Sequence, residues 1–197
     1  MSGPLGTGLL LAAGLSLWPT DLRDKESLRF TSISEQAWDE SCGMASLDSL
    51  LRFYRGTSIP SELIDSHSGE LSLRTLLELT SSTGLDCGAF RMDYAQLCET
   101  LWHYAPVLVH YDKPDAHFAL ALAADGDSVV CADPARGTEC LSVPDFLERW
   151  SGATLVVDYG PDREIGESLV EFTVDLARKR FDLLERSTVP ARRSFLE

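Results

Sequence analysis

Hydrophobic positions in the first half of the chain repeat with the spacing of amphipathic helices. The stretch CGMASLDSLLRFY has apolar residues three or four positions apart and is followed by Gly56, which predicts a helix from about residue 42 to this glycine. The next stretch, PSELIDSHSG, predicts a short helix that ends at Gly69. A third helix is expected in SLRTLLELTSSTG, with Ser72 as its N-cap and one face formed by Leu73, Leu76, Leu77 and Thr80.

The pattern changes after Leu85, where short apolar runs alternate with turn signals. The runs LDCGAFRM, PVLVHY, HFALALAA, SVVCAD, ECLSV and ATLVVDY are typical of β-strands, and DGD and PARG are typical of turns. Helices are expected in DYAQLCETLWHY and in VPDFLERW, which has Pro144 at its start. Because helices come first and strands joined by short turns follow, the predicted fold class is α+β, with amino-terminal helices packed on an antiparallel sheet.

The same patterns divide the chain into three parts. Residues 1–29 hold an apolar leader and a connector, residues 30–160 form the α+β domain, and residues 161–197 form an accessory helix and tail. The accessory helix is expected in REIGESLVEFTVDLARKRFDLLER. We expect it to pack on the sheet or to mediate assembly through an apolar stripe of Ile165, Leu169, Phe172, Leu176 and Leu183.

The leader contains the apolar stretch PLGTGLLLAAGLSLW. It has the length of a signal-peptide core and is too short to span a bilayer comfortably, but no Lys or Arg precedes it and no clear cleavage site lies before Asp21. It is either a signal peptide with an atypical start or a buried segment of the fold. The first alternative predicts a periplasmic or secreted protein whose mature chain has no membrane-spanning segment, and the second a cytoplasmic one.

Composition and charge argue against several classes of function. The formal net charge is −14, and an acidic surface repels both the phosphates of nucleic acid and anionic lipid. The five cysteines include no C-x-x-C pair, and the four histidines are scattered, so a structural zinc site is not expected. We therefore expect an acidic globular protein that binds no nucleic acid, metal or cofactor.

Cys42 stands where the first helix should begin, a position that suits a nucleophile. Cysteine attacks as a thiolate, and the helix dipole favours a negative sulfur at this end. Gly43 places no side chain beside the sulfur. A buried structural thiol or a disulfide partner would also account for a single cysteine, so the position alone leaves three alternatives.

A base and further polar groups stand elsewhere along the chain. His117 begins one apolar strand and Asp133 ends the next, so a hairpin at DGD would bring both to one end of the sheet. The carboxylate could then hold one imidazole nitrogen while the other takes the thiol proton. The amide of Gln36, with the Cys42 backbone N–H, would supply two donors for an oxyanion. Each residue alone also fits a structural role, but the order Gln, Cys, His, Asp at this spacing favours a thiol hydrolase.

This arrangement resembles the papain-like cysteine peptidases of the bacteriocin-processing type, the double-glycine leader peptidases fused to peptide-export ABC transporters. The resemblance rests on Gln36, on CGMASL and FYRG of the first helix, on LSLRTLLELTSSTGL, on PVLVHY and HFALAL, and on ADPARG, and it covers roughly residues 30 to 157. It implies a papain-like fold in which Cys42 is the nucleophile, His117 the general base and acid, Asp133 the orienting residue and Gln36 an oxyanion donor.

The residues before the cysteine point to a subgroup of this family. Transporter-fused members often have Asp-Cys-Gly, whereas this chain has DESCG, which resembles stand-alone exported members, some encoded beside functional-amyloid or pilus-like secretion systems. The resemblance implies a peptidase that cleaves a peptide or protein, such as a secreted leader-bearing or fibre-forming protein of a secretion or fibre-assembly system. Two alternatives are an amide transferase or isopeptidase with the same site, and a catalytically silent peptide-binding module of a secretion system.

Several other residues carry structural expectations. Trp38 either walls a substrate groove or packs, His110 ends a strand near the presumed site, and Trp102 and Trp150 are expected in the core.

Two more cysteines lie in the strands on either side of PARG. If Asp133 opposes Thr138 in this hairpin, Cys131 opposes Cys140, with Cβ atoms about 4.5–5.5 Å apart, close to the separation of a disulfide. In an oxidising compartment the pair could form a bridge, and otherwise both thiols stay reduced.

Overall fold

The computed structural model describes residues 28–30, 32–37, 41–56, 58–59, 71–160 and 163–188. The expected leader, Trp38, the short helix ending at Gly69 and the tail beyond residue 188 lie outside the described residues. The side chains of Ile165 and Leu183 also lie outside them.

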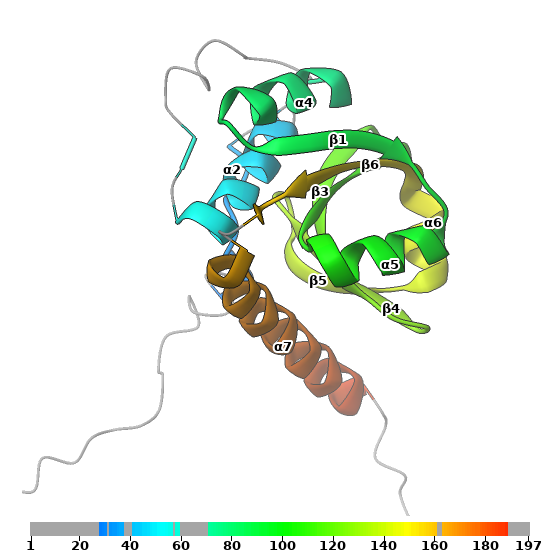
Figure 1. The fold of residues 1–197 in the computed structure, drawn as a ribbon. Coiled ribbons are helices and arrows are strands. Elements are labelled where there is room, and N and C mark those ends of the chain that lie inside the picture. The colour runs from blue at the N-terminus through cyan, green and yellow to red at the C-terminus, as the bar shows by residue number, and fades with distance from the viewer. Residues whose placement is uncertain are drawn as a thin grey trace, which may run out of the picture.

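A six-stranded antiparallel sheet forms the centre of the molecule, in the order β1-β6-β2-β3-β4-β5 (Figure 1). Its strands are β1 (Asp86–Arg91), β2 (Val107–Tyr111), β3 (His117–Ala124), β4 (Ser128–Asp133), β5 (Gly137–Ser142) and β6 (Trp150–Asp158). Strands β2 to β5 are neighbours in space as they are in sequence, so short turns connect them. The predicted α+β fold with an antiparallel sheet is confirmed.

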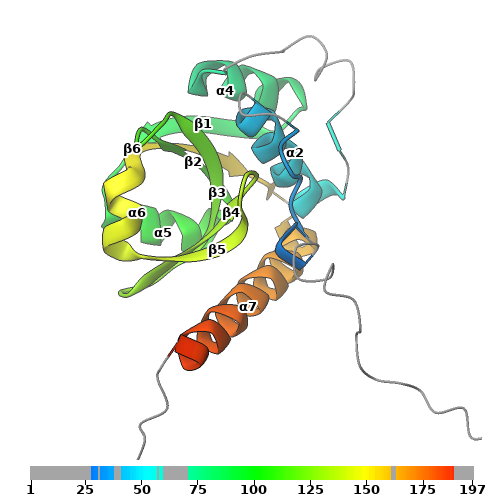
Figure 2. The same cartoon turned by 180° about the vertical axis from the view of Figure 1, so that it is seen from behind.

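Helices cover both faces of this sheet (Figures 1 and 2). One face carries α2 (Cys42–Arg55), α4 (Leu73–Ser82) and α7 (Arg163–Thr188), with the short 3-10 helix η1 (Leu28–Phe30), and the other carries α5 (Tyr94–Tyr104) and α6 (Val143–Arg149). Side chains alternate along the central strands, so Leu108 and Leu120 join the core beside α2, whereas Val109 and Ala121 join the core beside α5 and α6. The sheet therefore has a separate apolar core on each side.

Helix α2 is buried on nearly every side because the sheet, α4 and α7 all pack against it. Its largest fully buried side chains are Leu47, Leu50, Phe53 and Tyr54. Gly56 ends the helix in the left-handed conformation, with φ of 59°, and its N–H donates to the Arg52 carbonyl at 3.1 Å. The hydroxyl of Ser46 donates to the Phe118 carbonyl of β3 at 3.1 Å, which ties α2 directly to the sheet.

Helix α7 packs along α2 and the neighbouring strands. Val170, Thr173 and Ala177 are buried in this interface, and the Thr173 hydroxyl donates to Ser32 Oγ at 2.9 Å. Further along the helix, Arg178 pairs with Asp125 of the β3–β4 turn at 2.9 Å.

The buried face of α7 differs from the expected stripe. Leu169 and Leu176 are partly buried, but Phe172 is 54% exposed, so its assignment to the packed face was wrong. The smaller residues Thr173 and Ala177 take the contact instead, because they allow α7 to lie close to α2.

The β4–β5 hairpin differs from the expected register by one residue. Asp133 pairs with Gly137 instead of Thr138, so Cys131 and Cys140 are not opposite each other. A shift of one residue turns side chains to the other face of the sheet, and the two cysteines accordingly join different cores. The prediction that Cys131 and Cys140 lie opposite each other was wrong, and both thiols are free.

Gly137 explains why the turn between β4 and β5 is one residue shorter than expected. Its φ of 81° lies in the left-handed region, and an added Cβ would come within 2.5 Å of the Arg29 Cβ. Only glycine therefore fits where η1 crosses the hairpin.

The two tryptophans differ in environment. Trp150 is 8% exposed and packs beside Phe146, as expected, but Trp102 is 81% exposed, so its placement in the core was wrong. Helix α5 turns Leu97 and Leu101 to the sheet and leaves Trp102 on its outer side.

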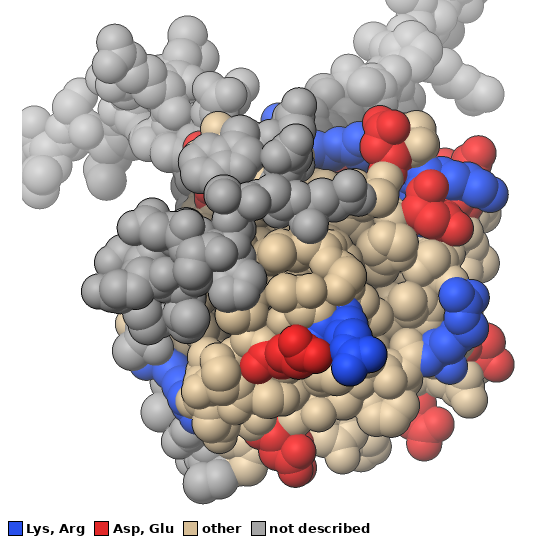
Figure 3. Space-filling view, turned by 90° about the horizontal axis from the view of Figure 1, so that it is seen from above, with Lys and Arg blue, Asp and Glu red and all other residues tan. Residues whose placement is uncertain are grey.

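The surface mixes charges of both signs. On the face seen from above, acidic and basic side chains are interspersed with uncharged ones (Figure 3). Within the described ranges, no helix combines the length and apolar character needed to cross a membrane.

Candidate active site

Cys42 is the first residue of α2 and is 7% exposed. Backbone N–H groups at the start of a helix lack intrahelical acceptors, and together with the helix dipole they favour a negative sulfur here. Gly43 also lies close to neighbouring side chains: an added Cβ would lie 3.3 Å from Leu76 Cδ2 and 3.5 Å from Leu71 Cβ. Its missing side chain allows α4 to pack against the start of α2.

The β3–β4 hairpin brings His117 and Asp133 together. His117 begins β3, Asp133 ends β4, and His117 Nε2 lies 3.0 Å from Asp133 Oδ1. The same carboxylate oxygen accepts the backbone N–H groups of Ala135 and Arg136, at 2.8 and 3.2 Å, and Asp133 is 1% exposed. The turn after β4 thus fixes the carboxylate, and the carboxylate holds one imidazole nitrogen.

The pKa values indicate an ion pair between Cys42 and His117. Burial raises the pKa of Cys42, but hydrogen bonds from His117 and from the Phe118 N–H, with the His117 charge, outweigh it and leave the pKa below the usual value. Burial lowers the pKa of His117, but its hydrogen bonds to Asp133 and Cys42 raise it to about 9. Burial raises the pKa of Asp133, and the bond and charge of His117 bring it below its ordinary value. At neutral pH these directions favour a thiolate beside an imidazolium.

Gln36 lies at the same end of the sheet. Its backbone N–H donates to the Pro134 carbonyl at 2.9 Å, which attaches it to the turn after Asp133. Gln36 also lines a cavity together with His117 and Asp133. Its side-chain Oε1 is buried without a hydrogen-bond partner in the part of the chain that the structure describes.

A buried carboxylate on α2 holds the segment that leads to Gln36. Asp48 is 7% exposed, accepts a short hydrogen bond from the Ser34 hydroxyl, and accepts the Ile59 N–H at 2.8 Å. The Ser34 N–H donates to Ser49 Oγ at 2.8 Å. Helix α2 therefore carries Cys42 and also anchors the segment that contains Gln36. Sequence analysis missed Asp48, although an acidic residue between the apolar positions Leu47 and Leu50 of the predicted helix was a visible signal.

Tyr111 packs beside His117 and was also missed. The two rings are stacked with centroids 6.1 Å apart, and the Tyr111 hydroxyl donates to Cys131 Sγ at 3.4 Å. Tyr111 pairs with His117 in the β2–β3 register, so the hairpin pattern of PVLVHY and HFALALAA could have revealed the contact. The ring restricts the motion of the imidazole.

His110 has a different environment. Its Nδ1 lies 3.0 Å from Ser151 Oγ, and its ring lies 5.0 Å from that of Phe118. As the residue next to Tyr111 on β2, it points to the opposite face of the sheet from the Tyr111–His117 pair.

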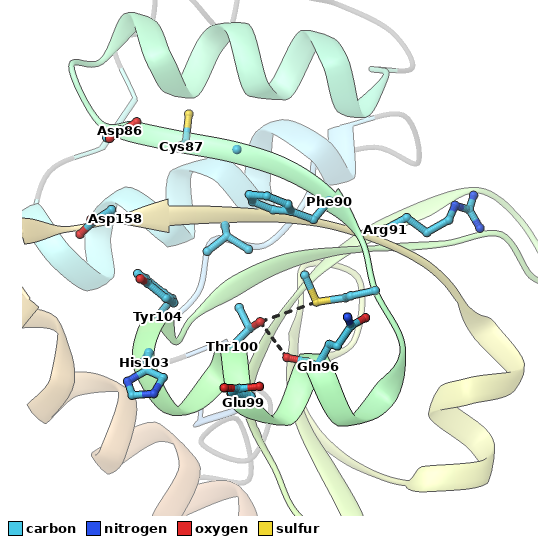
Figure 4. A pocket seen from close by; sticks show the side chains of 13 residues that line it. Asp86, Cys87, Phe90, Arg91, Gln96, Glu99, Thr100, His103, Tyr104 and Asp158 are labelled. Carbon is cyan, nitrogen blue, oxygen red and sulfur yellow. Dashed lines mark hydrogen bonds between the residues drawn. The ribbon is translucent and has the colours of Figure 1, made fainter.

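Two of the cavities formed by the described residues bear on the position of the candidate site. The one beside His117 and Gln36 has a volume of about 440 Å³. The larger one, of about 710 Å³, lies between β1, β6 and α5, where Phe90, Thr100 and Tyr104 surround it (Figure 4). None of the four candidate residues lines the larger cavity, so the candidate chemistry belongs to the smaller one. Among the described residues, no group of His, Cys, Asp and Glu side chains is arranged to hold a metal ion.

Comparisons with known proteins identify the family. The family model of the Peptidase C39 family matches residues 31–162. A curated relative from Pseudomonas aeruginosa, the probable functional amyloid protease FapD, is 29% identical over 147 residues, which are 68% of this chain and 64% of the relative. The chain thus spans somewhat less than two thirds of that relative's length.

Solved structures share the fold at low sequence identity. A double glycine motif protease from an AMS/PCAT transporter, in complex with its leader peptide, has a TM-score of 0.56 at 22% identity, covering 64% of this chain and 89% of that one. The peptidase domain of Streptococcus ComA has a TM-score of 0.57 at 17% identity, covering 64% and 96%. The predicted family is confirmed: the chain belongs to the Peptidase C39 family.

Proposed function

We propose that the chain is a cysteine peptidase in which Cys42, His117, Asp133 and Gln36 form the catalytic site. The observation that carries the proposal is the hydrogen bond of 3.0 Å between His117 and the buried Asp133, with Cys42 on the other side of the imidazole. The lowered pKa of Cys42 and the His117 pKa of about 9 supply the nucleophile and the acid at neutral pH.

The reaction follows from these positions. The Cys42 thiolate attacks the carbonyl carbon of the scissile bond, and the amide of Gln36 with the Cys42 N–H stabilises the oxyanion. His117 then gives its proton to the leaving nitrogen, the C–N bond breaks and a thioester remains. His117 next takes a proton from water, which attacks the thioester and releases the acid, restoring the thiolate–imidazolium pair. Asp133 keeps the imidazole oriented and stabilises its charge throughout.

The comparisons suggest the kind of substrate. One relative is named for functional amyloid, and one solved structure is a double glycine motif protease in complex with the leader peptide. We propose that the substrate is a secreted protein that carries a leader or forms fibres, and that a secretion or fibre-assembly system supplies it. We therefore also propose that the enzyme acts in the periplasm or outside the cell.

Alkylation and turnover test the proposal together. Iodoacetamide should label Cys42 faster than the four other cysteines at neutral pH, and Cys42→Ala should abolish peptide hydrolysis while the circular dichroism spectrum stays unchanged. Cys131→Ala is the matched control, because burial raises the pKa of that thiol far above its usual range and the proposal gives it no chemical role. Faster labelling of another cysteine, or full hydrolysis by Cys42→Ala, would exclude the assignment. Turnover that requires an added amine would indicate a transferase instead.

A further inference from the structure

The cavity beside His117 is lined by three of the four candidate residues and extends past them, and its walls carry positive charge. Its volume of about 440 Å³ falls in the range of ligand pockets, roughly 300–1,000 Å³. Three basic residues, Lys113, Arg136 and Arg149, line it with the carboxylates of Asp115 and Asp133, and Asp133 is already bound to His117. In a chain of net charge −14, this is a local excess of positive charge.

Arg149 brings an unsatisfied donor to this cavity. Its side chain is 28% exposed, and its Nη1 forms an ion pair with Glu139 Oε1 at 3.6 Å, a distance beyond ordinary hydrogen-bond length. Both atoms are buried without a hydrogen-bond partner in the described part of the chain. Leaving a buried charged donor unbonded is unfavourable, so an added carboxylate acceptor would be stabilised here.

Glu139 places a further carboxylate beside these positive charges. Burial raises the pKa of its carboxyl and the charge of Asp133 raises it further, against the opposing charges of Arg136 and Arg149. The charge of Arg136 lowers the pKa of Glu139, so its guanidinium is close enough to interact with groups at this end of the sheet. Arg136 and Lys113 are exposed at the rim, so they can move to meet a ligand.

The chemistry of the site determines which part of a substrate enters the cavity. His117 protonates the leaving nitrogen, so the leaving part of the substrate lies on the imidazole side. Cys42 retains the acyl part, and Cys42 is not among the residues that line the cavity. The cavity therefore receives residues that follow the cleaved bond.

We propose that this cavity binds an acidic side chain in the first residue after the cleaved bond, through Arg149, Arg136 and Lys113. The inference rests on the proposed function, because Cys42 and His117 define the leaving side. Asp115 balances part of the positive charge, so a single carboxylate matches the site.

Partitioning of the acyl-enzyme tests this directly without knowledge of the natural substrate. The whole chain is acylated with an N-blocked Gly-Gly p-nitrophenyl ester, which releases p-nitrophenol and leaves a thioester on Cys42. Water or an added dipeptide amide then attacks: the amine forms the new amide, the C–S bond breaks, and the proton of the amine passes to His117. The probes are Glu-Ala-amide, Gln-Ala-amide and Lys-Ala-amide, which occupy the leaving side and differ only in the charge of the first residue.

We expect the ratio of aminolysis to hydrolysis to be about tenfold higher for the Glu probe than for the Gln probe, and lowest for the Lys probe. The double variant Lys113→Glu and Arg136→Glu should reverse this order, since both positions are exposed and tolerate substitution. Arg74→Glu, at an exposed position on α4 outside the cavity, is the matched control and should keep the wild-type order.

The outcomes separate this inference from the proposed function. Equal partitioning of the three probes by an enzyme that is acylated at Cys42 would overturn the inference and leave the peptidase intact. A reversed order in Arg74→Glu would also overturn it, because the preference would then depend on overall charge. Failure of the ester to acylate Cys42 would overturn the proposed function and this inference with it.

Discussion

Replacing Asp48 should weaken the fold and slow catalysis together, because this carboxylate joins the segment that carries Gln36 to the helix that carries Cys42. Asp48 is buried and accepts hydrogen bonds from the Ser34 hydroxyl and from the Ile59 N–H. It also pairs with Arg52 at 2.9 Å, where the arginine side chain is 48% exposed.

The magnitude follows from these contacts. A hydrogen bond to a charged group contributes about 1.5–3 kcal/mol, so loss of both bonds in Asp48→Ala should cost about 3–6 kcal/mol. The half-exposed pair with Arg52 adds at most about 1 kcal/mol. Asp48→Asn keeps an oxygen that can accept only one of the two donors at full strength, and we expect a loss of about 2–3 kcal/mol. Since a small domain is stable by only about 5–15 kcal/mol, the Asn variant is the safer one for measurement.

Urea unfolding followed by tryptophan fluorescence gives the free energy of unfolding, and peptide hydrolysis at low temperature gives kcat on the folded variant. We expect Asp48→Asn to lower kcat more than it raises KM, because Gln36 is less firmly held where the oxyanion forms. Arg52→Ala should change the free energy of unfolding by less than about 1 kcal/mol and leave kcat unchanged. Wild-type stability in Asp48→Asn would refute the energetic argument, and lower stability with wild-type kcat would refute the link to Gln36.

Four further predictions concern the catalytic groups and the last helix. The rate of hydrolysis should rise as the pH passes through the lowered pKa of Cys42. It should fall as the pH passes through about 9, where His117 loses the proton that the leaving nitrogen needs. A rate that keeps rising beyond that pH would contradict the ion pair. Asp133→Asn removes the anion that keeps His117 protonated, so the alkaline limb of the pH profile should move to lower pH, with more activity left than in His117→Ala. Gln36→Ala should lower kcat roughly ten- to a thousandfold with little change in KM, and a rise in KM alone would mean that Gln36 only contacts substrate. Ala177→Asp places a charge in the α2–α7 interface and should lower the melting temperature, whereas an unchanged value would show that α7 does not contribute to the core.

Local patterns predicted the elements and part of the site for identifiable reasons. DGD is a strong turn signal between two apolar runs, and a hairpin there necessarily places the start of one strand beside the end of the next, as His117 and Asp133 now show. The cap at Ser72 was equally readable, and its hydroxyl accepts the Thr75 N–H at 3.1 Å. The catalytic roles of these residues remain predictions.

Faces and registers could not be predicted because they depend on distant contacts. Cys131 and Cys140 were placed opposite each other, but Gly137 shortens the turn where it meets Arg29, more than a hundred residues earlier in the chain. Trp102 lies on a helix whose apolar residues occupy more than one side, and only the position of the sheet decides which side is buried. Long-range pairing of this kind is not encoded in any short stretch of sequence.

The burial of α2 between the sheet, α4 and α7 has a consequence for domain exchange. Val170 and Ala177 of α7 belong to the same apolar core as the residues of α2, whereas the family match ends at residue 162. A graft of the matched residues onto another protein, such as a transporter, would present the uncovered side of α2 to water or to the new partner. We therefore expect a fusion of the matched residues to another protein to fold well only if the surface of α2 that α7 covers is changed as well. Helix α7 thus limits the transfer of this peptidase domain to other proteins.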